Sequence, residues 1–240
     1  MDYKTQLLEI EAFKRFPSLI PHVSENYNNG KYRKLFLVWE SYYDTQDKGK
    51  EYYENREKWY NLNGSCSNDE MHELWKKNDW RKYWNFECKI DKNGCNKNGA
   101  TFLNPERELK KFSDEKDSYS FCTGYNYFLR PASPKQTGKQ QRFIFTPKKE
   151  DHEYAFNAFC KIIEVIKPEL IVFFSSKARD SFKKQKKKNN SKFSDIRIKY
   201  FQHPSSPWWH RKECPQGLAI FLQNNNWIIE QQGDEQVSIN

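Results

Sequence analysis

One stretch of the chain decides its fold class: Lys167-Pro168-Glu169-Leu170-Ile171-Val172-Phe173-Phe174. The continuous apolar run at 170–174 is typical of a strand buried on both faces of a parallel sheet. Residues 150–167, just before it, carry apolar side chains at helical spacing, and Pro168 is the expected end of that helix. A helix that leads directly into a doubly buried strand indicates an α/β protein.

Further apolar runs extend this pattern in both directions along the chain. They predict strands over 34–39, 120–129 and 196–201, and helices over 176–184 and 216–229. Strands that alternate with helices imply right-handed crossovers and a parallel sheet covered on both faces. We therefore predict a three-layer α/β/α fold with a central, mostly parallel four-stranded sheet.

The remaining segments are expected to elaborate this fold rather than to form separate units. Residues 2–16 have helical spacing, and residues 18–28 are interpreted as a short second helix. Residues 45–118 are polar and rich in aromatic side chains, which favours an inserted group of helices. A basic, flexible loop is expected at 132–141. The whole chain, residues 1–240, is interpreted as a single domain.

Composition narrows the class of partner. Hydrophobic residues make up only 36% of the chain and aromatic residues 17%, so Phe, Tyr and Trp must supply much of the core. The formal net charge of +9 favours a polyanionic partner through counterion release. An excess of lysine also simply keeps a surface soluble, so the charge alone is a modest signal.

No membrane segment or metal site stands out in the sequence. There is no apolar run of about 18 residues, and the start, Met1-Asp2-Tyr3-Lys4, lacks the layout of a signal peptide. We therefore expect a cytoplasmic protein with reduced thiols and no contact with a membrane. The six cysteines form no Cys-x-x-Cys pair. One cluster in the insertion offers a zinc site as the alternative, but its spacing matches no common zinc pattern: Cys66, His72, Cys88 and Cys95.

Two predicted strands end in residues that suit catalysis. Glu40 follows the apolar run 35–38, and His203 follows the strand 196–201. Ligands of parallel α/β sheets bind at the carboxyl ends of the strands. We therefore expect the carboxylate and the imidazole to face one pocket, although they lie far apart in the sequence.

Three motifs in a fixed order extend this pair of residues. They are Trp39-Glu40-Ser41-Tyr42-Tyr43, the strand with Asn126 shortly before Arg130-Pro131, and His203-Pro204-Ser205. Together with the stretch at 167–172, they resemble the uracil-DNA glycosylase superfamily, of which this chain looks like a divergent member. The resemblance covers residues 31–44 and about 119–230.

The resemblance implies an enzyme that hydrolyses the bond between a base and its sugar in DNA. A carboxylate, Glu40, would stabilise the developing positive charge or hold the attacking water. A neutral imidazole, His203, would stabilise the departing base, and the Asn126 amide would read the base edge. Water is the nucleophile, so no cofactor is expected.

The expected site residues fall into three groups. For catalysis they are Glu40, His203 and Asp44. For base binding they are Asn126, Tyr43 and Ser41. For contact with DNA they are Ser205, Ser206, Trp208, Trp209, Arg211 and Arg130. No residue is expected to bind a metal, DNA is the expected partner, and the protein is expected to act as a monomer.

Departures from the family pattern leave alternatives open. Trp39 replaces the usual glycine, and Ser41 stands where the most active branch carries Asp. The substrate is therefore uracil or a modified pyrimidine, the latter in foreign DNA; alternatively, the protein binds nucleic acid or a nucleotide without catalysis. Trp208 and Trp209 either close the core or stack on bases. The lysine-rich segment 183–190 is either a solvated loop or a phosphate contact.

Overall fold

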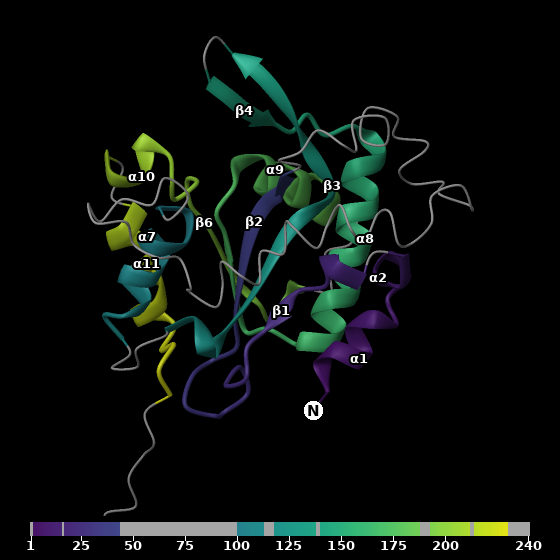
Figure 1. The fold of residues 1–240 in the computed structure, drawn as a ribbon. Helices are drawn as coiled ribbons and strands as arrows, with labels where there is room; N and C mark the ends of the chain where they lie inside the picture. The colour runs from purple at the N-terminus through teal and green to yellow at the C-terminus, as the bar shows by residue number, and fades with distance from the viewer. Residues whose placement is uncertain are drawn as a thin grey trace, which may run out of the picture.

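A computed structural model of the chain describes residues 2–15, 17–43, 100–112, 118–137, 140–187, 193–211 and 214–229. These residues form a mixed β-sheet with helices on both sides (Figure 1). The predicted α/β class is confirmed. None of the helices described has the length and apolar character needed to cross a bilayer.

The sheet contains more strands than predicted. Its strands are β1 (His22–Val23), β2 (Leu35–Tyr43), β3 (Cys122–Thr137), β4 (Gln140–Ile144), β5 (Leu170–Phe173) and β6 (Arg197–Tyr200). Their order is β1-β3-β2-β5-β6, and β4 pairs with β3. The β3–β2, β2–β5 and β5–β6 pairings are parallel, whereas β1–β3 and β3–β4 are antiparallel. The prediction of four strands is therefore corrected to six.

The two additional strands were missed because neither contains a run of apolar residues. β1 is only two residues long and lies in the segment 18–28, where a helix was predicted. β4 pairs with the far half of β3, from Ser133↔Ile144 to Thr137↔Gln140, where a basic loop was predicted. Strands at the edge of a sheet do not need the continuous apolar pattern of a buried strand.

Helices lie on both sides of the sheet. They are α1 (Tyr3–Leu8), α2 (Glu11–Arg15), α7 (Ala100–Leu109), α8 (Lys149–Ile166), α9 (Ser176–Lys186), α10 (Pro207–Arg211) and α11 (Cys214–Asn224), with 3-10 turns η1 (Pro17–Leu19) and η2 (Ser118–Phe121). Figure 1 shows α1, α2, α8 and α9 on one side, and α7, α10 and α11 on the other. Of the predicted insertion, 45–118, the segments 45–99 and 113–117 lie outside the described residues.

The helix and strand that decided the fold class form as the sequence predicts. The predicted apolar face of α8 is buried, and the helix ends at Lys167, which has φ 47°, before Pro168. A proline cannot continue the helix, so the chain turns there into β5. All of β5 is buried, as a strand covered on both faces requires.

Aromatic side chains dominate the core, as the composition predicts. On the side of α8 and α9, Phe36 stacks on Phe159 with ring centroids 5.5 Å apart. On the other side, Trp39 of β2 packs against Phe102 of α7 at 5.3 Å. Consecutive residues of β2 thus contact opposite helix layers, because side chains alternate along a strand.

Candidate active site

Glu40 lies where β2 extends past its neighbour β5. The last register pair of these strands is Val38↔Phe173, and the Phe174 amide donates to the Val38 carbonyl oxygen at 2.8 Å. Beyond that point the chain of β5 turns away into α9. Glu40 is therefore at the carboxyl edge of the sheet, as predicted.

The Glu40 carboxylate is held at the start of α9 by two donors. The Ser175 hydroxyl donates to Oε2 at 2.8 Å, and Lys177 Nζ donates to Oε1 at 3.1 Å. Ser175 is also the N-cap of α9, because its Oγ accepts the Ala178 amide at 3.2 Å. The positive end of the helix dipole favours a carboxylate at this position.

Lys177 also ties this corner to the segment that precedes α8. Its ammonium donates to the Phe145 carbonyl oxygen at 2.7 Å as well as to Glu40. The site prediction included neither Ser175 nor Lys177. Ser175 has the sequence signal of an N-cap, but only the pairing of β2 with β5 shows which carboxylate it meets.

The imidazole of His203 is oriented by its own turn. Its Nδ1 accepts the Ser205 amide at 3.3 Å and lies 2.8 Å from Ser205 Oγ. Because Nδ1 accepts a backbone N–H, the neutral ring carries its proton on Nε2. Burial lowers the pKa of His203, whereas the negative charge of Glu40 raises it and so opposes that effect.

The electrostatic influence of Glu40 on His203 means that these residues lie near each other at the same edge of the sheet. The result is a carboxylate next to a ring that burial keeps in its neutral form. Such a ring donates a hydrogen bond through Nε2 without carrying a charge. The arrangement can bind a water molecule at one group and an oxygen acceptor at the other.

A residue of the predicted insertion holds the His203 turn in place. The Asn104 amide of α7 is buried and donates to the Pro204 carbonyl oxygen at 2.7 Å. Within the turn, the Ser206 amide donates to the His203 carbonyl oxygen at 2.8 Å. Sequence reasoning missed Asn104, because no local pattern relates α7 to a turn so distant in the sequence.

Asn126 and Ser41 lie on a different face of the sheet from Glu40. Asn126 of β3 is in register with Trp39, and Ser41 follows two positions later on β2. Register partners and alternate residues share a face, so all three face α7, whereas Glu40 faces α9. Ser41 Oγ is buried and forms no hydrogen bond within the described part of the chain.

Two residues predicted to contact DNA belong to the interior instead. Arg130 is buried and forms a bidentate pair with Asp151, with Nε–Oδ1 at 2.8 Å and Nη2–Oδ2 at 2.6 Å. Trp209 is 1% exposed and packs against Phe174 at 5.8 Å. Neither side chain is accessible to a phosphate or a base, so both predictions are corrected to structural roles.

The other residues predicted to contact DNA differ in how far the structure describes them. Trp208 is 52% exposed, Ser205 is exposed, and Ser206 is half-buried. Arg211 ends α10, but its side chain lies outside the described residues. Tyr43 pairs with Ala132, again without a described side chain. Asp44, Cys66, His72, Cys88 and Cys95 lie outside the described residues altogether.

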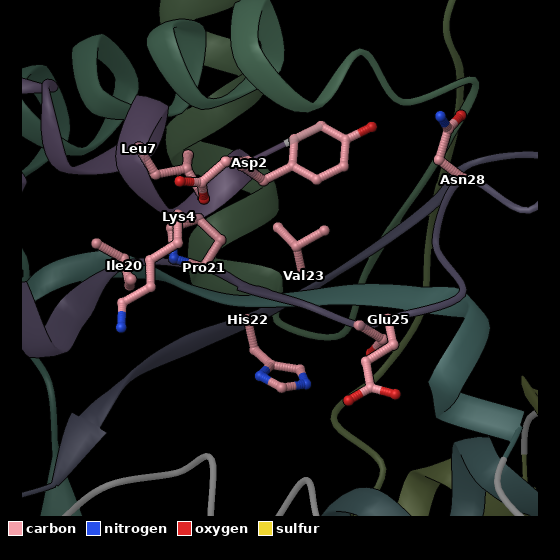
Figure 2. Close-up of a pocket in the computed structure, with 11 residues that line it drawn as sticks. Asp2, Lys4, Leu7, Ile20, Pro21, His22, Val23, Glu25 and Asn28 are labelled. Atoms are coloured by element: carbon pink, nitrogen blue, oxygen red, sulfur yellow. The ribbon is translucent and has the colours of Figure 1, made fainter.

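A cavity of about 440 Å³ lies at the far side of β1, away from Glu40 and His203 (Figure 2). Side chains of α1 and of the segment around β1 line it, including Asp2, Lys4, His22 and Glu25. Figure 2 shows His22 and Glu25 projecting away from Asp2 rather than toward it. The polar groups therefore do not converge on one ligand position.

A second cavity, of about 540 Å³, lies between the α1–α2 segment and α8 and is lined mainly by apolar groups. The described residues contain no cluster of three or more His, Cys, Asp or Glu side chains that could hold a metal ion. No family model matches the chain, and no curated protein is significantly similar to it.

Proposed function

We propose that this protein is a DNA glycosylase with a uracil-DNA glycosylase-like fold. It flips a base, uracil or a modified pyrimidine, out of DNA and hydrolyses its N-glycosidic bond to leave an abasic site. The observation that carries the proposal is the approach of Glu40 to a neutral His203 at the carboxyl edge of the sheet. We further propose that it acts as a monomer in the cytoplasm and needs no cofactor.

The two residues have complementary roles in this reaction. Glu40 accepts a hydrogen bond from the attacking water and faces the positive charge that builds on the sugar. A C–O bond forms at the anomeric carbon while the C–N bond breaks, and its electron pair leaves with the base. The Nε2–H of His203 stabilises the negative charge on a base oxygen. The leaving base then takes up a proton.

Substrate binding involves the accessible residues near this edge. Flipping a nucleotide costs a few kcal/mol, which contacts to the flanking strand must offset. Ser205, Ser206 and the exposed ring of Trp208 are suited to that contact. The Asn126 amide and the Ser41 hydroxyl, which share one face of the sheet, would read the base edge.

The direct test is incubation with oligonucleotides that carry uracil or one of several modified pyrimidines, followed by alkaline cleavage at abasic sites. Mass spectrometry of the released base identifies the substrate. Glu40→Gln and His203→Gln should each lower base release by about 100-fold or more while the protein stays folded. Glu164→Gln and His22→Gln are matched controls outside the site. Failure of the wild-type protein to form abasic sites in any of these substrates would contradict the proposal.

A second candidate is a protein that binds nucleic acid or a nucleotide without catalysis. It is favoured by the Lys177 ion pair and the Ser175 hydrogen bond, which already occupy the Glu40 carboxylate, and by the position of Asn126 on the opposite face. This alternative predicts DNA binding with no abasic sites, and a Glu40→Gln variant that behaves like the wild-type protein. A glycosylase for modified bases of foreign DNA is instead favoured by Trp39 at the position of the usual glycine.

A further inference from the structure

The sheet edge formed by β6 carries exposed cations. In the described part of the chain, β6 pairs with β5 alone, so its other edge has no partner strand there. Its side chains alternate: Arg197 and Lys199 are exposed, and Ile198 and Tyr200 are half-buried. One side of the strand is therefore positively charged along its length.

Cations of α9 lie on the other side of the same strand. Lys183 Nζ lies 4.5 Å from the centroid of the Tyr200 ring, so the basic end of α9 lies beside β6. Lys184 and Lys187, in the same part of the helix, are exposed. Because Tyr200 and Lys199 point to opposite faces, lysine and arginine side chains flank β6 on both sides.

Few carboxylates compensate this charge. The nearest acid on α9, Asp180, is already bound to Arg179 at 2.7 Å. Asp195 is an exposed carboxylate shortly before β6. The cations of this surface form no ion pair with another described residue; they are Lys183, Lys184, Lys187, Arg197 and Lys199. We call these five residues the basic edge.

The basic edge adjoins the candidate active site along the chain. β6 continues from Lys199 through two half-buried residues after Tyr200 to His203. At about 3.3 Å per residue, Lys199 lies within roughly 13 Å of His203. A nucleic-acid strand that reaches His203 can therefore also reach the basic edge.

We propose that the basic edge binds the phosphate backbone of DNA next to the candidate active site. This inference rests on the proposed function for the identity of the polyanion. Lysine and arginine side chains that neutralise phosphates release condensed counterions, which makes such binding strong at low salt. The contacts carry no sequence information and would hold the strand while one base is flipped.

The competing explanation is protection of the sheet edge. Charged side chains on an exposed edge strand prevent pairing with the edge of another molecule. Protection requires charge at the edge but no bound polyanion. The two explanations therefore differ in what happens to DNA binding when the charges are removed.

The test compares two variants of equal net charge in the full-length chain. The first carries Lys184→Gln, Lys187→Gln, Arg197→Gln and Lys199→Gln; it keeps Lys183, which packs on Tyr200. The control carries Lys4→Gln, Lys14→Gln, Lys31→Gln and Lys161→Gln, all outside α9 and β6. Fluorescence anisotropy measures binding to an undamaged duplex, a single strand and anionic lipid vesicles at several salt concentrations.

The proposal expects the basic-edge variant to bind DNA about tenfold or more weakly at low salt, and the slope of log affinity against log salt to fall by roughly 0.9 for each lost contact to a duplex phosphate. The control variant should stay within about twofold of the wild-type protein. Equal losses in both variants, an unchanged basic-edge variant, or a loss confined to the vesicles would each overturn the inference.

The same variants separate this inference from the proposed function. Base release with unchanged DNA binding in the basic-edge variant would overturn the inference and leave the glycosylase proposal standing. Absence of base release in the wild-type protein, together with a loss of DNA binding in the basic-edge variant, would do the opposite. In that case the basic edge binds DNA for a purpose other than base excision.

Discussion

The Asn104 amide of α7 donates a hydrogen bond of 2.7 Å to the carbonyl oxygen of Pro204, next to His203. This buried contact joins the segment after residue 99 to the turn that orients the imidazole. The two partners come from different elements, so the geometry of the turn depends on how α7 packs on the sheet. Trp39 contributes to that packing through Phe102.

Replacing Asn104 should disturb His203 as well as stability. Asn104→Ala leaves a buried carbonyl without its donor, which costs about 1–3 kcal/mol of unfolding free energy. We expect the pKa of His203 to rise toward its ordinary value, because a looser turn buries the ring less. NMR titration of the imidazole measures this shift. Asn225→Ala, which removes an amide bond of 2.7 Å to Phe221, is the matched control, and an unchanged His203 titration would contradict the prediction.

Lys177 should matter for activity more than for folding. Lys177→Met removes one donor from Glu40 and leaves the carboxylate free to rotate. A partly exposed ion pair is worth about 1 kcal/mol, which corresponds to a loss of roughly fivefold in the rate of base release. Lys177→Arg should retain most of the rate. Lys161→Met, which breaks the exposed pair with Glu164, should have no effect; an equal loss there would show that the effect is not local.

Stability should decrease as the pH falls below the ordinary histidine pKa of 6.5. Burial lowers the pKa of His203 and His152 in the folded protein. Between the folded pKa and 6.5 the unfolded chain binds more protons, so the unfolding free energy falls with falling pH and levels off below the folded pKa. Urea titrations at a series of pH values measure this slope. A His152→Gln, His203→Gln double variant should have a flatter profile, and an identical profile would contradict the prediction.

The adjacent tryptophans should give opposite phenotypes. Trp209 is buried against Phe174 and Phe201, so Trp209→Ala should lower the unfolding free energy by about 3–5 kcal/mol. Trp208 is exposed, so Trp208→Ala should leave thermal stability nearly unchanged and weaken DNA binding by about 1–3 kcal/mol if its ring stacks on a base. Calorimetry and anisotropy separate the two effects. Normal DNA binding by Trp208→Ala would remove it from the proposed interface.

The buried ion pair between Arg130 and Asp151 should stabilise the fold. Arg130→Met leaves the Asp151 carboxylate buried with only the Lys148 amide as a described donor. Removing one partner of a buried pair costs about 3–5 kcal/mol. The exposed pair of Arg179 with Asp180 is the control, and Arg179→Met should cost under about 1 kcal/mol. Equal costs in urea unfolding would show that burial does not determine the difference.

Local sequence patterns predicted the central elements of the fold. The apolar face of α8, its end before Pro168 and the buried run of β5 each follow from side-chain spacing and backbone chemistry that neighbouring residues share. Patterns of this kind also placed Glu40 and His203 at strand ends. β1 and β4 were missed because edge strands leave no comparable apolar signal.

The sequence by itself determined that helices and strands alternate, that the core is aromatic, and that an acid and a histidine follow separate strands. Only the tertiary structure decided which groups those residues meet. Ser175 and Lys177 reach Glu40 because β2 extends past β5, and Asn104 reaches Pro204 because α7 packs beside Trp39. It also turned Arg130 and Trp209 inward. Burial and hydrogen-bond partners depend on contacts between distant segments, whereas periodicity depends only on neighbours in the chain.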